Sequence, residues 1–269
     1  MVAVRDARID VRDASRSEAL SHLRRLRVRL EDGGETTVHV ASYPRAETRV
    51  RVALLPPATT LVSWCDRRGV GDAIVGGFFL RRPLEPAAPE LFGMPLGALR
   101  IDGVAQRTVA FDAPWDARRA CVHVDGEIAI ARRDQLPDGG AGDLLQAGPL
   151  LVHDRRAVDH ADEGFAEGAG QFDQDITVGR HPRAALALDD RSVLAVACDG
   201  RAADEAGLSL AELAQTLIAL GARTALNLDG GGSTSLVCGR RLRNAPRDAE
   251  GRAIAGGRAI PTALYFERR

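Results

Sequence analysis

The first third of the chain alternates hydrophobic and polar residues with the period of two that is typical of β-strands. The alternating or apolar runs are residues 26–30, 38–40, 50–54, 73–75, 98–101, 108–111 and 121–124. Asp32-Gly33-Gly34 follows the first run and Asp125-Gly126 follows the last, and both sequences are typical of hairpin turns. This pattern predicts a β-rich body.

The clearest helical signal lies between Gly207 and Gly221. Ser209 and Glu212 have the spacing of a capping box, the apolar residues at 210, 213, 214, 217 and 218 share one helical face, and Gly221 marks the end. Strands are predicted at 184–188, 193–198, 222–228 and 236–238, with Asp189-Asp190 in the turn of the first two. One secure helix among many strands predicts an α+β class: a single β-rich domain over residues 1–269, with a mixed or antiparallel sheet and a few packed helices.

Three segments without periodicity are predicted to be loops: residues 81–95, 134–142 and 159–177. The last is long enough to be a functional loop. Gln171, Asp173 and Asp175 could contact a ligand there, and a solvated acidic loop is the alternative.

Composition excludes several classes of mechanism. All 36 basic residues are arginines, so the chain has neither the lysine of a P-loop nor the Schiff-base lysine of a pyridoxal enzyme. A net charge of -1 and an aromatic content of 4% argue against a nucleic-acid partner. No apolar run reaches the roughly 20 residues of a membrane span, and the N-terminal residues lack a signal-peptide pattern, so a cytoplasmic location is expected unless a leader precedes them.

The metal-binding residue types show no recognisable spacing. Cys65, Cys121, Cys198 and Cys238 lie far apart without any CxxC pair, which favours buried, inert thiols. His153, His160 and His181 belong to no HExxH or similar motif. We therefore assign no metal and no cofactor.

The segment from Asp229 to Thr234 concentrates candidate chemistry between two predicted strands. Its three glycines, Gly230, Gly231 and Gly232, would let the main chain approach a ligand and form an anion-binding nest, beside the Asp229 carboxylate and the hydroxyls of Ser233 and Thr234. The alternative is a tight turn closed by the aspartate side chain. No G-x-S-x-G elbow is present, which argues against a serine hydrolase.

Two arginines bracket the strand pair just upstream, in His181-Pro182-Arg183 and Asp199-Gly200-Arg201. Two guanidinium groups converging on a glycine nest would hold a phosphate or carboxylate bidentately. Ordinary surface arginines are the alternative.

Several short blocks occur in a fixed order along the chain. They are Gly76-Gly77-Phe78-Phe79, Gln146-Ala147-Gly148-Pro149-Leu150, His181-Pro182-Arg183, Asp199-Gly200-Arg201, the helix 207–214, Leu226-Asn227-Leu228-Asp229 with the following Gly-Gly-Gly-Ser-Thr, and Asn244-Ala245-Pro246. Over residues 69–266 these blocks and their order resemble the phosphodiester glycosidase family, and the block that starts at Leu226 is similar to the family's signature. Residues 1–68 form a β-rich N-terminal part outside it.

The resemblance implies a hydrolase that cleaves a sugar-1-phosphodiester of the N-acetylglucosamine-1-phosphate type at the anomeric carbon. It makes Asp229 the catalytic carboxylate, with Asp199 second. Phosphate and sugar contacts are then expected from Arg183, Arg201, Asn227, Gly230, Gly231, Gly232, Ser233, Thr234, Gly76 and Gly77. The implied partner is a sugar-phosphate small molecule or glycan.

One position departs from the family. Val75 stands where members commonly carry an asparagine before the Gly-Gly-aromatic-Phe block, which leaves the substrate open. Two other functions stay open as well. One is a metal-assisted phosphoesterase that cleaves the P–O bond with Asp229, Asp199 and Asp173 around the metal. The other is a binding module for sugar phosphates or anionic polysaccharides.

Overall fold

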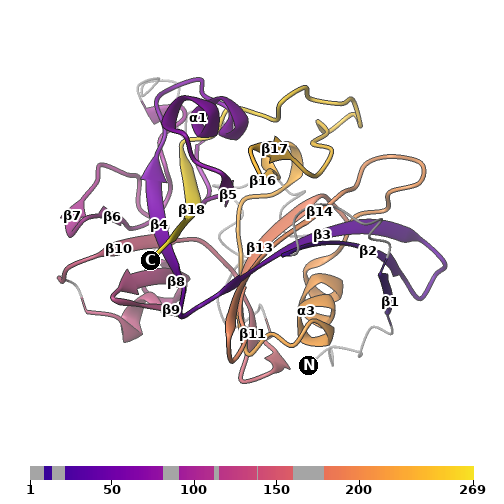
Figure 1. The fold of residues 1–269 in the computed structure, drawn as a ribbon, viewed down its shortest axis with the longest axis horizontal. Helices are drawn as coiled ribbons and strands as arrows, with labels where there is room; N and C mark the ends of the chain where they lie inside the picture. Colours follow the sequence, from indigo (N-terminus) through magenta and orange to yellow (C-terminus); the bar gives the residue numbers. More distant parts are fainter. Residues whose placement is uncertain (1–8, 14–21, 81–90, 112–114, 138, 160–178) are drawn as a thin grey trace.

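Three antiparallel sheets dominate the computed structural model, which describes residues 9–13, 22–80, 91–111, 115–137, 139–159 and 179–269 (Figure 1). Strands make up 44% of the chain and helices 13%, so the predicted β-rich α+β class is confirmed. Most of the predicted functional loop, including Gln171, Asp173 and Asp175, lies outside the described residues, as does much of the predicted loop at 81–95.

The largest sheet has eight strands and carries most of the candidate residues at the ends of its central strands. In spatial order its strands are β1 (Asp10–Asp13), β2 (Leu23–Arg29), β3 (Glu35–Pro44), β14 (Ser192–Cys198), β13 (Arg183–Leu188), β15 (Thr224–Asn227), β11 (Leu150–His153) and β12 (Arg156–Ala157). The predicted hairpin at Asp32-Gly33-Gly34 joins β2 to β3, and the predicted pair β13–β14 is antiparallel with Asp189 in its turn.

Two five-stranded sheets complete the β structure. One runs β7 (Val104–Ala105), β6 (Leu99–Ile101), β10 (Asp143–Gln146), β8 (Ala120–Asp125) and β9 (Glu127–Arg132). The other runs β17 (Arg241–Leu242), β16 (Leu236–Cys238), β5 (Asp72–Val75), β18 (Thr262–Arg268) and β4 (Thr48–Leu54). The predicted Asp125-Gly126 turn joins β8 to β9.

The large sheet is buried on both faces. Leu186 and Leu188 of β13 belong to the core shared with the two smaller sheets, whereas Ala185 and Ala187 belong to the core beneath α3 (Leu210–Ala219). Figure 1 shows α3 against one side of this sheet, with β4, β18 and α1 (Leu61–Arg68) on the other. Burial on both sides explains why β13 reads as a continuous apolar run instead of an alternating one.

The helix α3 begins as its sequence predicts. The Ser209 hydroxyl accepts from the Glu212 main-chain N–H, and the Glu212 carboxylate accepts in return from the Ser209 N–H at 2.9 Å. Arg180 donates to both oxygens of Glu212 through Nε at 3.0 Å. Burial alone would raise the pKa of Glu212, but these bonds outweigh it and hold the pKa below its ordinary value.

The predicted strand at residues 108–111 is wrong. Val109 forms an isolated bridge with Leu96, in which its N–H donates to the Pro95 carbonyl and its carbonyl accepts from the Gly97 N–H, and no regular strand forms over these residues. Phe111 instead turns its ring under the Arg119 guanidinium, 4.6 Å from the ring centroid, so packing ends the pairing after Val109. Conversely, α1 and the four-residue α2 (Trp115–Arg118) have no counterpart among the predicted elements.

The four cysteines are free thiols and all are buried, as predicted. Burial raises the pKa of Cys65 and Cys198 to about 12, which keeps these two thiols neutral at physiological pH. Across the described part of the chain, no helix has the length and apolar character that crossing a bilayer requires.

We expect Glu212→Gln to destabilise the protein by about 1–2 kcal/mol at pH 7, because glutamine keeps the cap but loses the charge that Arg180 pairs with. A carboxylate with a lowered folded-state pKa contributes its stability above the unfolded value, here 4.5, and loses it as the pH falls through the folded value. The difference from wild type should therefore shrink in acid. Urea unfolding at pH 7 and pH 3.5 measures it, with exposed Glu31→Gln as the control; an equal difference at both pH values would contradict the charge argument.

Candidate functional site

The segment from Asp229 to Ser235, here called the glycine loop, connects β15 to β16. Gly231 has a φ of +58°, and its N–H donates to the Pro182 carbonyl at 2.8 Å. The Gly230 N–H donates to the Asp229 carboxylate at 2.9 Å. Both N–H groups are thus bonded inside the protein in this conformation, so the loop has the predicted tight turn closed by aspartate, and these two groups do not form an open nest.

Two guanidinium groups lie against the glycines. A Cβ on Gly231 would come within 3.2 Å of both terminal nitrogens of Arg201, and a Cβ on Gly232 would come within 2.6 Å of Nη2 of Arg258. Arg201 also approaches the His181 ring and the Arg247 carbonyl, at 3.4 and 3.3 Å. Because these two glycines have no side chains, the guanidinium groups of two arginines can pack against the main chain of the loop.

Arg183 lies deeper than the sequence suggested. Its side chain is fully buried, and it donates to the main-chain carbonyls of Leu208 and Gly179 at 3.0 and 3.1 Å. Of the two predicted arginines, Arg201 is the one that lies against the glycine loop. The second arginine there is Arg258, which the sequence analysis missed because nothing in its Gly-Gly-Arg context distinguishes it from the other arginines.

Buried polar side chains at Asn227 and within the glycine loop share one feature. Four of their oxygens are buried and make no hydrogen bond to any described residue: Asn227 Oδ1, Ser233 Oγ, Thr234 Oγ1 and Ser235 Oγ. Buried polar atoms in folded proteins almost always have a partner, either protein, water or ligand. Their concentration within nine residues, beside the buried Asp229 carboxylate, indicates a place where a polar molecule is bound.

Asp229 and Asn227 are held from behind by other segments of the chain. The Asp229 N–H donates to the Gly76 carbonyl at 3.0 Å. The Asn227 side-chain amide donates to the Gly148 and Leu228 carbonyls, both at 2.9 Å. The structure therefore brings the Gly76-Gly77 and Gln146–Leu150 blocks, which are distant in the sequence, up against the signature segment.

Asp199 lies at the end of β14 with both carboxylate oxygens engaged. Oδ2 lies 3.0 Å from Nε2 of His39, and Oδ1 accepts from the Ala245 N–H at 2.6 Å. Asn244 bonds the Thr234 carbonyl at 2.8 Å, which joins this group to the glycine loop. The sequence analysis missed His39 because its alternation with Val38 and Val40 indicates only a position in a strand.

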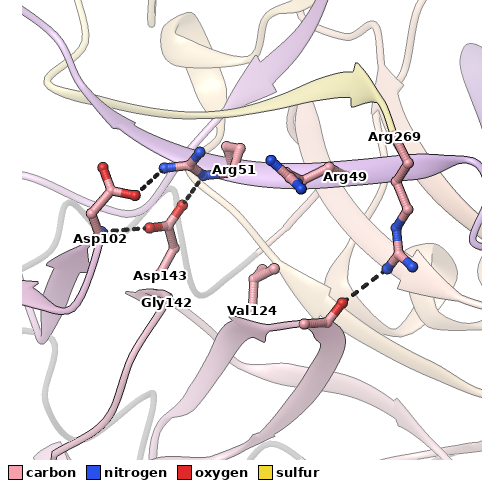
Figure 2. Close-up of a pocket in the computed structure, with 8 residues that line it drawn as sticks. Arg49, Arg51, Asp102, Val124, Gly142, Asp143 and Arg269 are labelled. Carbon is pink, nitrogen blue, oxygen red and sulfur yellow. Dashed lines mark hydrogen bonds and ion pairs between the residues drawn. The ribbon is translucent and has the colours of Figure 1, made fainter.

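Cavities of about 440 and 470 Å³ lie elsewhere and have no predicted site residue in their lining. The first contains Arg49, Arg51 and Arg269 (Figure 2). Arg51 donates to Asp143 at 2.8 Å and also pairs with Asp102. The hydrogen bond to Asp143 raises the pKa of Arg51 and engages its guanidinium group. The glycine loop is therefore the better candidate for the ligand-binding site.

Comparison with known proteins decides the family. The sequence profile described as phosphodiester glycosidase matches residues 70–267. The chain belongs to the phosphodiester glycosidase family. This match nearly coincides with the segment 69–266 over which the sequence blocks suggested the family, so that prediction is confirmed.

Solved structures share the fold of this family member. The zebrafish N-acetylglucosamine-1-phosphodiester alpha-N-acetylglucosaminidase catalytic domain, in a form inhibited by its pro-peptide, aligns with a TM-score of 0.68 at 18% identity, covering 97% of this chain and 88% of that one. A hypothetical protein from Synechocystis aligns with a TM-score of 0.61 at 20% identity, covering 98% and 68%. A Burkholderia pseudomallei protein aligns at 0.56 and 17%, covering 87% and 74%. No curated protein sequence matches the chain.

A substitution at Gly76 tests whether the Gly76-Gly77-Phe78-Phe79 block contributes to stability through close packing. A Cβ at Gly76 would lie 2.8 Å from the main-chain carbon of Thr262 and 2.5 Å from its hydroxyl. Because backbone cannot move aside cheaply, we expect Gly76→Ala to destabilise the protein by about 1–3 kcal/mol. Gly71→Ala, with no atom within 4 Å of the added Cβ, is the matched control. Equal melting temperatures for the two variants would contradict a packing role.

Proposed function

We propose that this phosphodiester glycosidase hydrolyses a sugar-1-phosphodiester of the N-acetylglucosamine-1-phosphate type at the anomeric carbon. The observation that carries the proposal is the group of buried oxygens at Asn227 and on the glycine loop that have no hydrogen-bond partner among the described residues, close to two guanidinium groups. Hydroxyls and an amide oxygen suit the hydroxyl and acetamido groups of a sugar, and guanidinium groups suit a phosphodiester.

In the proposed reaction, water forms a bond to the anomeric carbon as the bond from that carbon to the phosphate oxygen breaks. The electron pair leaves with the phosphate monoester, which is a good leaving group because its second pKa is about 6. Asp229 accepts the proton from water, or it first forms a bond to the carbon itself, which water then hydrolyses to release the sugar, as carboxylates do in glycosidases. Asn227, Ser233 and Thr234 orient the sugar or the water.

The departing phosphate carries negative charge, so cations close to it stabilise the transition state. Arg201 and Arg258 are the arginines that we assign to this role, because both lie against the glycine loop. The buried Arg183 has the structural role of bonding the Leu208 and Gly179 carbonyls. Asp199 is the second candidate for the catalytic carboxylate. It is hydrogen-bonded to His39, and we assign its role to the two side chains together.

Isotope labelling separates this proposal from the phosphoesterase and binding-module alternatives. The protein is incubated with N-acetylglucosamine-1-phosphodiesters and a nucleotide sugar in heavy-oxygen water, and the products are analysed by mass spectrometry. We expect the label in the released sugar. Label in the phosphate would mean P–O cleavage and would overturn the mechanism, and saturable binding without product would favour a binding module.

The same assay tests the role of Asp229. We expect Asp229→Asn to lower kcat by about a hundredfold or more, because an amide can neither accept the proton nor attack the carbon. Exposed Asp66→Asn on α1 is the control and should keep wild-type activity. If a folded Asp229→Asn enzyme kept most of its activity, the catalytic carboxylate would be a different one, with Asp199 next to be tested.

Arg258 gives a prediction that the sequence alone did not suggest. Arg258→Lys keeps the charge but loses the planar donor pair, so we expect kcat/KM to fall by about ten- to a hundredfold, the equivalent of one charge-assisted hydrogen bond. Arg191→Lys, at an exposed position in the β13–β14 turn, is the matched control. An unchanged kcat/KM would remove Arg258 from the phosphate site.

A further inference from the structure

Three side chains with metal-binding atoms meet where the large sheet joins the β16–β5–β18 sheet. His22 directly precedes β2, Asp72 opens β5, and Cys238 ends β16. Their ligand atoms all lie within 4.8 Å of one another. We call this group the junction cluster. It shares no residue with the candidate active site.

The two distances from the histidine nitrogen are close to those between ligands of one metal ion. Nε2 of His22 lies 3.3 Å from Oδ2 of Asp72 and 3.2 Å from Sγ of Cys238. Bond lengths of 2.0–2.3 Å around a tetrahedral zinc ion place neighbouring ligand atoms about 3.3–3.6 Å apart. A Cys-His-Asp catalytic triad would use the two nitrogens of the histidine for its two partners. Here the thiol and the carboxylate both face Nε2, which is the geometry of a shared ion.

The ligands are positioned by bonds that leave their metal-binding atoms pointing at the centre. Oδ1 of Asp72 accepts from the Gly239 N–H at 2.7 Å, so Oδ2 is the oxygen directed at His22. The His22 carbonyl accepts from the Ser42 N–H at 2.8 Å, which fixes the backbone beside β3. Outer bonds of this kind orient carboxylate and histidine ligands in metal sites.

Tyr43 lies beside the junction cluster, with its ring centroid 5.4 Å from that of His22. It is 6% exposed, and its ring stacks on Phe266 at 4.2 Å. Its buried hydroxyl faces Asp72 and Cys238 and interacts with both of them. An ion held by these two side chains would therefore lie next to the hydroxyl.

An ion could reach the cluster from solvent. The side chains of His22 and Asp72 are 30% and 20% exposed, whereas Cys238 lies beneath them, fully buried. A ligand set of one sulfur, one nitrogen and one oxygen suits a borderline-soft divalent ion better than magnesium or calcium, which take oxygen ligands.

We propose that His22, Asp72 and Cys238 bind one divalent transition-metal ion of the zinc class, with the Tyr43 hydroxyl or a water in the fourth position. The ion links the large sheet to the β16–β5–β18 sheet and stabilises their junction. The sequence analysis assigned no metal because it searched for local spacings, and His22 and Cys238 are 216 positions apart.

Cobalt provides a direct spectroscopic test, since a cysteine thiolate bound to Co²⁺ gives a charge-transfer band in the near ultraviolet. We expect the chelator-treated full chain to bind one equivalent of Co²⁺ with this band, and Zn²⁺ to displace it. Cys238→Ala should abolish the band, while Cys121→Ala, which removes a buried thiol from β8 in another sheet, should retain it. His22→Ala and Asp72→Asn should each weaken Co²⁺ binding tenfold or more.

Thermal unfolding gives a second readout. Zn²⁺ should raise the melting temperature of wild type and Cys121→Ala, and should leave that of His22→Ala unchanged. His22 is partly exposed, so this variant keeps the test valid if Cys238→Ala does not fold. A folded wild-type chain without the cobalt band, or a band of unchanged affinity in both His22→Ala and Asp72→Asn, would overturn the proposal.

Discussion

The candidate site depends on the close approach that the glycine loop permits between segments that are distant in the sequence. Without side chains at Gly231 and Gly232, the guanidinium groups of Arg201 and Arg258 lie directly against the main chain. A methyl group at Gly232 would overlap Arg258. The loop is in turn fixed by the Pro182 carbonyl and by Asn244. A steric constraint therefore concentrates positive charge beside a buried carboxylate.

The large sheet supplies the rigidity that this arrangement requires. Its central strands are buried on both faces, so the ends of β13, β14 and β15 have little freedom to move. Asp199 directly follows β14 and Asp229 lies two residues after β15, and each is further held by main-chain hydrogen bonds. Polar groups placed at the ends of well-packed strands keep their geometry better than groups on long loops.

The buried polar atoms divide into two kinds. Glu212 and Asp143 have their bonds satisfied within the protein, and they stabilise a helix start and a sheet junction respectively. The oxygens of Asn227, Ser233 and Thr234 make no such bonds to the described residues. Since an unsatisfied buried group is costly, these oxygens support the proposal that a sugar phosphate binds at the glycine loop. The metal ion proposed at the junction cluster rests instead on the three ligand atoms that converge there.

Features that depend on neighbouring residues could be predicted from the sequence by itself. The capping box of α3, the Asp-Gly turns and the strand pair around Asp189 follow from local backbone preferences, and the ordered blocks were enough to indicate the family. The sequence could not show which of 36 arginines lie against the glycine loop, that His39 pairs with Asp199, or that Phe111 packs instead of extending a strand. Nor could it bring His22 to Asp72 and Cys238. Those contacts join residues far apart in the chain, and only the packing of the sheets against one another determines which distant side chains meet.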